Sequence, residues 1–306
     1  MIPKTGQKTV LVTGGAMRLG AALCETFAKA GWQVLCHYRS GEAQALALCQ
    51  QLRDEGHAAS ALYADLAQTS DCIAMMATVE REHGVLDCLV NNASLFIPDT
   101  GLDFDAAQAA AQLQVNLLAP LMLAKIMANS IANSSAVPGA IPIPIPISSA
   151  NSSLDHIASA GNAANGDGAA KKRAGHRDAC AIHILDQKVY NLNPDYFSYT
   201  VSKLALERAV SLHAQSLAPH LRVCGVAPGL MYLSGPQTAD NFNLAASANL
   251  MRRPTDPLDV AKTCLFLAST PSITGTTVSV DNGQHLVPLP RDIMFVVEEL
   301  LKKHAA

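Results

Sequence analysis

Short apolar runs alternate with longer amphipathic stretches along most of the chain. The apolar runs are rich in β-branched residues, which predicts β-strands at residues 8–13, 32–38, 58–63, 85–90, 181–185, 221–226 and 276–280. Apolar residues recur with helical spacing between them, at residues 19–30, 41–55, 70–82, 104–132, 199–217, 258–267 and 291–303. Strands that alternate with helices predict an α/β fold of the Rossmann type, with a doubly wound parallel sheet in a three-layer α/β/α arrangement.

One segment, residues 133–178, interrupts this alternation. It is rich in Pro, Gly, Ser, Asn and Ala and has no hydrophobic period, so it predicts a low-complexity, flexible insertion in a single domain over residues 1–306. Its basic cluster Lys171, Lys172 and Arg173 is more typical of a solvated linker than of a site for an acidic partner. The insertion precedes a strand, so we expect it at the edge of the sheet opposite the carboxyl ends of the strands.

Two stretches near the C-terminus complete the pattern. Residues 230–250 are neither strongly periodic nor strongly polar, which favours a long loop that closes over a ligand. Residues 288–306 form a tail whose centre is amphipathic with helical spacing. We expect this helical tail to pack on a neighbouring subunit rather than on a membrane.

Composition excludes several classes of function. Hydrophobic residues make up 49% of the chain and charged residues 15%, as in a globular protein with a large core. The net charge is -3, so no overall basic field attracts nucleic acid or an anionic membrane. The eight cysteines have no metal-type spacing and lie mostly in apolar runs, as reduced buried thiols do. The N-terminus has no signal-peptide pattern and no apolar run reaches transmembrane length, which predicts a cytoplasmic protein.

Polar residues gather where the predicted strands end. In doubly wound sheets the ligand binds outside the carboxyl ends of the strands, so these positions predict the site. They are Gly14, His37, Tyr38, Arg39, Ser40, Asp65, Leu66, Asn92, Ala93, Ser94, Asp186, Pro228 and Gly229.

The first strand runs into a glycine-rich turn that opens a helix. Gly14, Arg18, Leu19 and Gly20 belong to this turn, whose free N–H groups suit a pyrophosphate. Arg18 stands where a glycine is common and adds a positive charge for a phosphate. The second strand ends without an acidic residue for a ribose 2′-hydroxyl and carries Arg39 instead, which favours NADPH over NADH.

Tyr199 and Lys203 are four residues apart in a predicted helix and therefore share one face. An ammonium beside a phenol stabilises the phenolate and lowers the phenol pKa from about 10. Tyr199 is then a proton donor and acceptor near neutral pH. This spacing is a weak signal by itself, because many surface helices carry such a pair.

Together, the segments TGGAMRLG, NNAS, YTVSK and APG, with Asn116, resemble the short-chain dehydrogenase/reductase family. The resemblance covers the chain except the insertion and the tail. It implies that Tyr199 donates the proton, that Lys203 lowers the Tyr199 pKa and holds the nicotinamide ribose, and that Asn116 completes a water relay. It also implies a homo-oligomer, either a tetramer or a dimer.

Two departures from the common family pattern narrow the resemblance. Asp186 replaces a serine thirteen residues before the tyrosine, and NNAS, followed by Leu95 and Phe96, replaces NNAG. At both positions, and at Arg18, the sequence resembles the pteridine reductases and the bacterial dihydromonapterin reductases. That resemblance implies that Phe96 stacks on a pterin and that Asp186 binds the pterin edge and supplies protons with Tyr199. We also expect Ser94, Leu230 and Met231 in the substrate site.

The sequence therefore predicts an NADPH-dependent reductase that transfers a hydride to a C=N bond of a dihydropterin. This chemistry needs a hydride on carbon and a proton on nitrogen, and a planar heterocycle suits an aromatic platform. Two alternatives stay open at this point. One is a carbonyl or sugar-alcohol reductase in which Asp186 is incidental, and the other is a non-catalytic NADPH-binding regulator. An acyl-chain reductase is less favoured, because such enzymes generally keep the serine.

Overall fold

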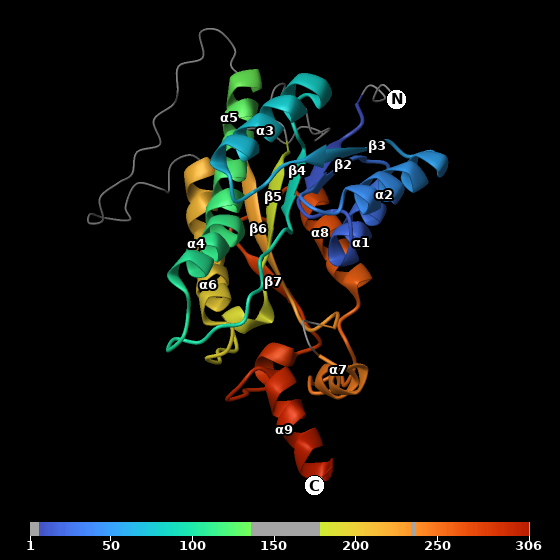
Figure 1. The fold of residues 1–306 in the computed structure, drawn as a ribbon. Helices are drawn as coiled ribbons and strands as arrows, with labels where there is room; N and C mark the ends of the chain where they lie inside the picture. Colours follow the sequence, from blue (N-terminus) through green and yellow to red (C-terminus); the bar gives the residue numbers. More distant parts are fainter. Residues whose placement is uncertain (1–5, 136–177, 234–236, 306) are drawn as a thin grey trace, which may run out of the picture.

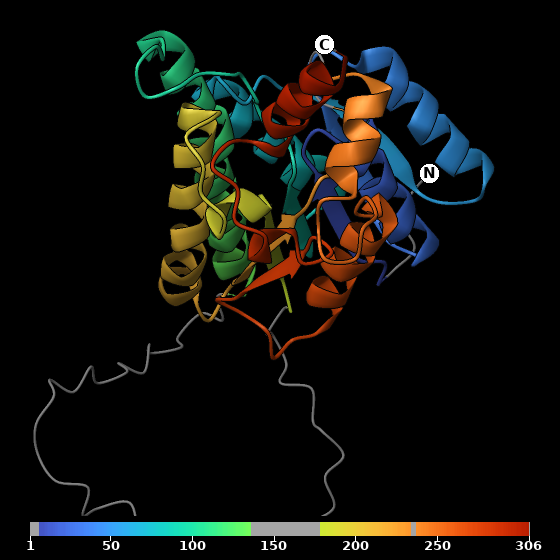
Figure 2. The same cartoon turned by 90° about the horizontal axis from the view of Figure 1, so that it is seen from below.

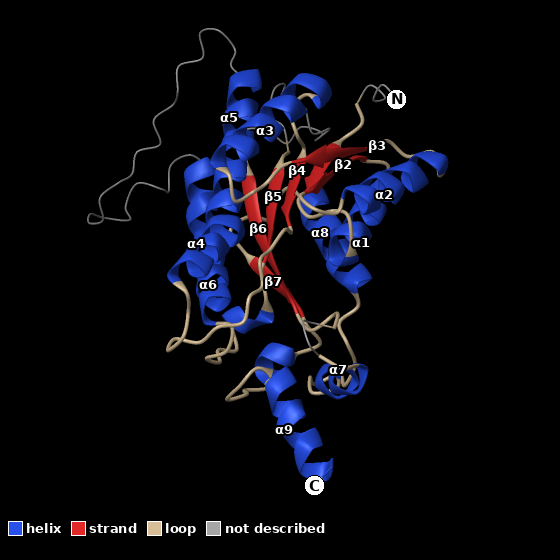
Figure 3. Cartoon of the chain, viewed as in Figure 1, coloured by secondary structure: helices blue, strands red, loops and turns tan. Residues whose placement is uncertain are grey.

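The chain folds around one parallel sheet in the α/β manner that the sequence predicts (Figures 1 and 3). The computed structural model describes residues 6–135, 178–233 and 237–305. Seven strands pair in the order β3-β2-β1-β4-β5-β6-β7, and every pairing is parallel. Their bounds are β1 Thr9–Val12, β2 Gln33–Tyr38, β3 Ala59–Tyr63, β4 Cys88–Asn91, β5 Cys180–Ile184, β6 Arg222–Pro228 and β7 Thr277–Val280.

Helices cover both faces of the sheet. One face carries α1 (Arg18–Lys29), α2 (Glu42–Asp54) and α8 (Pro257–Ser269), and the other carries α3 (Thr69–His83), α5 (Ala119–Ser135) and α6 (Phe197–Leu217). Figure 2 shows the blue and orange helices on one side of the strands and the green and yellow helices on the other. Both faces of the central strands are thus buried, which explains their unbroken apolar sequences.

The helix predicted at residues 104–132 has three parts. It consists of α4 (Ala106–Leu113), a π-helical turn (Gln114–Leu118) and α5. By length and composition alone the stretch Ala106–Ser134 is able to span a membrane, contrary to the expectation from the sequence, but half of its most apolar window is buried. Leu123 and Met127 pack into the core against the sheet, as in a core helix of a globular protein.

The C-terminal part differs from the prediction in two places. The stretch at 230–250 contains a helix, α7 (Ala239–Ala246), which the sequence pattern did not indicate. The predicted tail helix is present as α9 (Ile293–Ala305), but its buried side packs on α7 and Tyr196 of the same chain. The expectation that this helix packs on a neighbouring subunit is therefore wrong for its buried side. The predicted oligomer stays a prediction.

The two flanks of the predicted insertion lie at the amino edge of the sheet. Helix α5 extends to Ser135, a little past the predicted start of the insertion, and β5 begins at Cys180 beside Cys88 and Arg222, the first residues of β4 and β6. Residues 136–177 lie outside the described part of the chain, and with them the basic cluster and the prediction of a flexible segment. The attachment points are at the edge that the sequence predicts.

All eight cysteines are buried and free, as predicted. Two groups of thiols lie in the core on the α1–α2–α8 side, one around Cys36 and one around Cys224. Across the residues that the structure describes, no group of three metal-ligating side chains comes together.

His37, at the end of β2, fastens the glycine-rich turn to the sheet. Its Nδ1 accepts a hydrogen bond from Gly14 N at 3.0 Å, and its Nε2 lies 3.0 Å from the Ala64 carbonyl oxygen. Since Gly14 N is a donor and Ala64 O an acceptor, these bonds require the neutral ring with its proton on Nε2. Burial lowers the pKa of His37 to about 4.

This depressed pKa predicts a loss of stability in acid. Between pH 6.5 and 4 the unfolded His37 binds a proton that the folded ring does not, so the free energy of unfolding falls as pH falls. The loss is on the order of 3 kcal/mol across this window. Urea unfolding from pH 7 to 4.5 should show a steep slope in the wild type and a shallower one in His37→Gln. His183 and the carboxyl groups are unchanged in the variant, so their contribution to the pH dependence is the same in both proteins. Equal slopes of the free energy of unfolding against pH would therefore contradict the role given to His37.

Candidate active site

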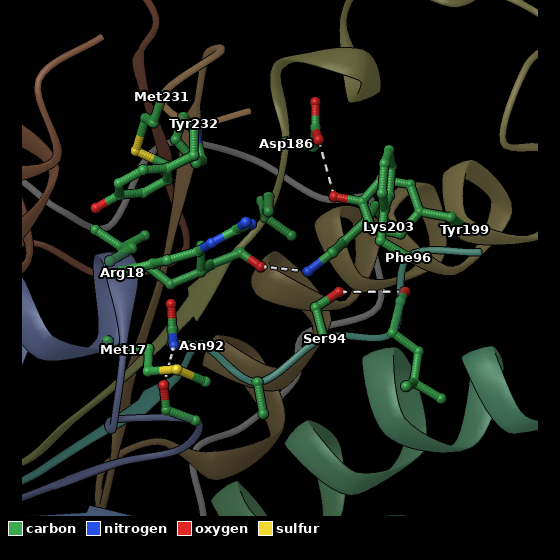
Figure 4. A pocket seen from close by; sticks show the side chains of 18 of the residues that line it. Met17, Arg18, Asn92, Ser94, Phe96, Asp186, Tyr199, Lys203, Met231 and Tyr232 are labelled. Atoms are coloured by element: carbon green, nitrogen blue, oxygen red, sulfur yellow. Dashed lines mark hydrogen bonds between the residues drawn. The ribbon is translucent and has the colours of Figure 1, made fainter. Parts of the chain in front are cut away.

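One large cavity opens at the carboxyl edge of the sheet, with a volume of about 550 Å³. Its wall contains every residue predicted for the cofactor and substrate sites: Gly14, Arg18, Leu19, Gly20, His37, Tyr38, Arg39, Ser40, Asp65, Leu66, Asn92, Ala93, Ser94, Phe96, Asp186, Tyr199, Lys203, Pro228, Gly229, Leu230 and Met231. Figure 4 shows ten of the lining residues labelled, with Asp186, Tyr199 and Lys203 together at one end of the cavity. Asn116 alone among the predicted site residues does not line it.

The glycine-rich turn between β1 and α1 is tight because its backbone folds back on itself. A Cβ at Gly20 would overlap the Gly14 carbonyl oxygen, and Gly14 has a left-handed φ of +61°. Both positions therefore require glycine. Arg18 also has a left-handed φ, 51°, a conformation that disfavours a long side chain.

Arg18 joins the turn to the loop after β6. Its guanidinium donates to the Leu233 carbonyl oxygen at 3.2 Å and lies 5.7 Å from the centre of the Tyr232 ring. Arg39 and Ser40 also line the cavity and are exposed at the end of β2, the strand next to β1. Two arginines from two strand ends thus bring positive charge to the same side of the cavity.

The other end of the cavity is built around a phenol and a carboxyl group. Tyr199, in the first turn of α6, donates a hydrogen bond of 2.8 Å to Asp186 Oδ2. Asp186 follows β5, and its Oδ1 accepts a bond of 2.9 Å from the Lys188 backbone N–H. Burial raises the pKa of Asp186, and the Lys188 bond opposes this rise. Burial and the neighbouring Asp186 charge raise the pKa of Tyr199 well above its ordinary value.

Lys203 lies one helical turn beyond Tyr199, as its spacing predicts. Its ammonium donates to the Ile184 carbonyl oxygen at 2.7 Å and lies 5.7 Å from the centre of the Tyr199 ring. Burial lowers the pKa of Lys203 to about 8. The net pKa of Tyr199 is therefore raised, not lowered as the spacing predicts, and the effect of Lys203 on it stays a prediction. The Asp186 carboxyl is hydrogen-bonded to the phenol, whereas the Lys203 ammonium is bonded to the Ile184 carbonyl oxygen and lies 5.7 Å from the ring centre.

Comparison with known proteins decides the family. A model described as short chain dehydrogenase matches residues 8–160, and one described as enoyl-(acyl carrier protein) reductase matches residues 169–285. The chain belongs to the short-chain dehydrogenase/reductase family. The resemblance of the glycine-rich turn and the YTVSK segment to this family is thereby confirmed.

Individual relatives differ in what they act on. The crystal structure of FolM alternative dihydrofolate reductase 1 from Brucella canis, complexed with NADP, is 30% identical with a TM-score of 0.74, covering 91% of this chain and 94% of that chain. A dihydromonapterin reductase from Citrobacter koseri is 23% identical over 90% of this chain and 96% of its own length. A 3β-hydroxysteroid dehydrogenase from Eggerthella lenta is 27% identical over 92% of this chain and 95% of its own length.

Asn116, which the family resemblance places in a water relay, lies in the π-helical turn and is buried. Its Oδ1 accepts from Leu95 N at 2.8 Å and from Ser94 Oγ at 3.1 Å. Its Nδ2 donates to the Leu95 carbonyl oxygen at 2.9 Å and to Ser202 Oγ at 3.1 Å. All four bonds hold the segment after β4 against α6, directly before Phe96. The relay itself stays a prediction.

Several cavity residues of this family member were not foreseen from the sequence. They are Lys188, Tyr196, Gln237, Gln284, Asp292, Ile293 and Met294. Three come from the start of the C-terminal helix, which the sequence indicates only as an amphipathic tail. Buried Lys188 is the one with a recoverable signal, since it follows Asp186 by two residues in the same strand-to-helix connection.

Proposed function

We propose that this chain is an NADPH-dependent reductase that delivers a hydride to a C=N bond of a dihydropterin. The observation that carries the proposal is the 2.8 Å hydrogen bond between Tyr199 and Asp186 inside the cavity. A phenol with a carboxyl behind it can supply a proton to a ring nitrogen, and a serine hydroxyl at position 186 would be a much weaker acid than the carboxyl.

The cofactor end of the cavity fits NADPH. The close turn at Gly14 and Gly20 leaves backbone N–H groups at the start of α1 for a pyrophosphate. Arg39, exposed at the end of β2, suits a 2′-phosphate. The structural relative from Brucella canis was solved with NADP, which supports this assignment.

The side chains near β5 and α6 account for the proton. NADPH, when bound, supplies the hydride. Tyr199 donates its proton to the substrate nitrogen, and Asp186 gives its own proton to the resulting phenolate. Since burial raises the pKa of the Asp186 carboxyl, this group holds a proton at higher pH than an exposed carboxyl does. The charge of Lys203, below its pKa of about 8, stabilises the transient phenolate.

Phe96 supplies the platform for a planar substrate. Its ring lines the cavity and is 40% exposed, and its neighbours Ser94 and Leu95 are fixed by Asn116. An aromatic face beside a hydrogen-bonding carboxyl suits a flat heterocycle with N–H groups on its edge. The relative named dihydromonapterin reductase supports a substrate of this class.

A carbonyl reductase is the second candidate. Leu230, Met231, Ile293 and Met294 give the substrate end an apolar wall, and one relative is named a 3β-hydroxysteroid dehydrogenase. Turnover with NADPH of a panel of dihydropterins and of cyclic ketones separates the two candidates. Ketone turnover without pterin turnover would remove the pterin proposal, and any turnover would remove the non-catalytic regulator. The cytoplasmic location and the tetramer or dimer stay predictions.

Replacing Asp186 by Ser tests the role of the carboxyl. We expect kcat/KM for dihydropterin to fall by roughly 10- to 100-fold, because a hydrogen bond to a charged group is worth about 1.5–3 kcal/mol. The dissociation constant of NADPH, measured by fluorescence titration, should stay nearly unchanged. Unchanged pterin kinetics in Asp186→Ser would show that the carboxyl is incidental.

Replacing Arg39 by Asp tests the choice of cofactor. The variant loses a charged partner for a 2′-phosphate and gains an acceptor for a 2′-hydroxyl. KM for NADPH should rise roughly tenfold or more while KM for NADH falls. Ser40→Ala is the matched control, since it removes a neutral partner and should change the ratio much less. An unaltered preference in Arg39→Asp would place the 2′-phosphate elsewhere.

A further inference from the structure

The backbone of Tyr196 is strained at the edge of the substrate site. Its φ of 55° and ψ of 50° are left-handed, directly before α6 begins at Phe197. A bulky residue rarely adopts this conformation, which is unfavourable in free energy. Such strain persists only where the surroundings enforce it, so the contacts of Tyr196 and its neighbours show what the conformation serves.

Both chain neighbours of Tyr196 are fastened to other segments. On one side, the buried Asp195 carboxylate accepts from Arg291 Nε at 3.0 and 2.8 Å and from Asp292 N at 2.7 Å. On the other, the backbone N–H of Phe197 and that of Ser198 donate to the carbonyl and the carboxylate of Asp99. The C-terminal tail and the loop after β4 therefore hold the two ends of the turn apart.

The turn aims the Tyr196 ring into a stack of three aromatic rings. Its centre lies 4.0 Å from that of Phe96 with an interplanar angle of 15°, and 6.1 Å from that of Phe295 with an angle of 18°. The ring is only 4% exposed. Lys188 Nζ, bonded to Asp292 Oδ2 at 2.7 Å, lies 5.3 Å from the centre of the Tyr196 ring.

From these contacts we propose that Tyr196 is a positioning residue for the substrate platform, holding Phe96 from behind at a fixed tilt. One face of Phe96 is covered by Tyr196, so a planar substrate can stack only on the opposite face. The Tyr199 ring, which carries the reacting hydroxyl, lies edge-on to Phe96, with ring centres 4.6 Å apart and an interplanar angle of 87°. This inference rests on the proposed function, because it assigns a backing to the ring that receives the pterin.

The structure of the stack makes the C-terminal helix part of the substrate site. Phe295, in the first turn of α9, lies behind Tyr196, and the Arg291 and Asp292 contacts fix the start of that helix. A shift of α9 is therefore transmitted through two stacked rings to Phe96. No part of α9 needs to touch the substrate for its packing to change substrate binding.

Substitutions at position 196 separate the ring from the strain. Tyr196→Phe keeps the stack, and we expect wild-type kinetics. Tyr196→Asn accepts the left-handed backbone but removes the ring, and KM for dihydropterin should rise roughly 3- to 10-fold, as expected for a lost aromatic pair. The value of kcat should change little, because Tyr199 and Asp186 are untouched, and the dissociation constant of NADPH should stay the same.

Four results would overturn the proposal. The first is an unchanged KM for dihydropterin in Tyr196→Asn, and the second is a rise in KM in Tyr196→Phe equal to that in Tyr196→Asn. If Tyr196→Asn fails to bind NADPH, Phe295→Leu replaces it, and an unchanged KM for dihydropterin in that variant is the third. The fourth is an absence of pterin turnover in the wild type. In Phe295→Leu the rear ring of the stack is lost, so a smaller rise in KM supports the proposal. Only the last result also removes the proposed function, so the two failures are distinguishable.

Discussion

The hydrogen bond between Tyr199 and Asp186 is the constraint on which the rest of the site depends. It joins the end of β5 to the first turn of α6, and the two residues come together only because the connection between them turns back over the sheet edge. The carbonyl oxygen of Ile184, the last residue of β5, accepts a hydrogen bond from the Lys203 ammonium. The same strand end therefore fixes Asp186, Tyr199 and Lys203. Burial raises the pKa of both partners of the bond.

The cavity has two ends with different origins. Its cofactor end is made from the strand ends of β1 to β4 and the tight turn before α1, which are close in the fold and regular in sequence. Its substrate end is assembled from three distant segments: the loop after β4, the connection from Asp186 to Tyr196, and the start of α9.

The strand ends could be predicted because polar, functional side chains directly follow the apolar runs that mark the strands. Apolar runs give the strands, and a ligand of a doubly wound sheet binds beyond their carboxyl ends, so Gly14, Arg39 and Asp186 fall into place without any structure. The tail residues Asp292 and Met294 could not be predicted, because they reach the cavity through tertiary packing that leaves no local pattern. The same holds for the strained backbone of Tyr196, which distant hydrogen bonds enforce.

The direction of the Tyr199 pKa shift shows a second limit of prediction from sequence. Helical spacing correctly places Lys203 beside Tyr199, but a pKa depends on burial and on which charge receives the hydrogen bond. Asp186 occupies that place, and sequence spacing alone did not indicate it. The phenol is thus paired with a carboxyl, and we propose that the pair is the unit that exchanges protons.

The pH dependence of kcat/KM for dihydropterin, in wild type and in Asp186→Asn, tests this central claim most directly. The wild type should lose activity in two steps as pH rises, one above the ordinary carboxyl pKa as Asp186 ionises and one near pH 8 as Lys203 loses its proton. In Asp186→Asn the first step should vanish. The second should move to lower pH, because the Asp186 charge raises the Lys203 pKa. Identical profiles in the two proteins would contradict a carboxyl–phenol pair as the source of the proton.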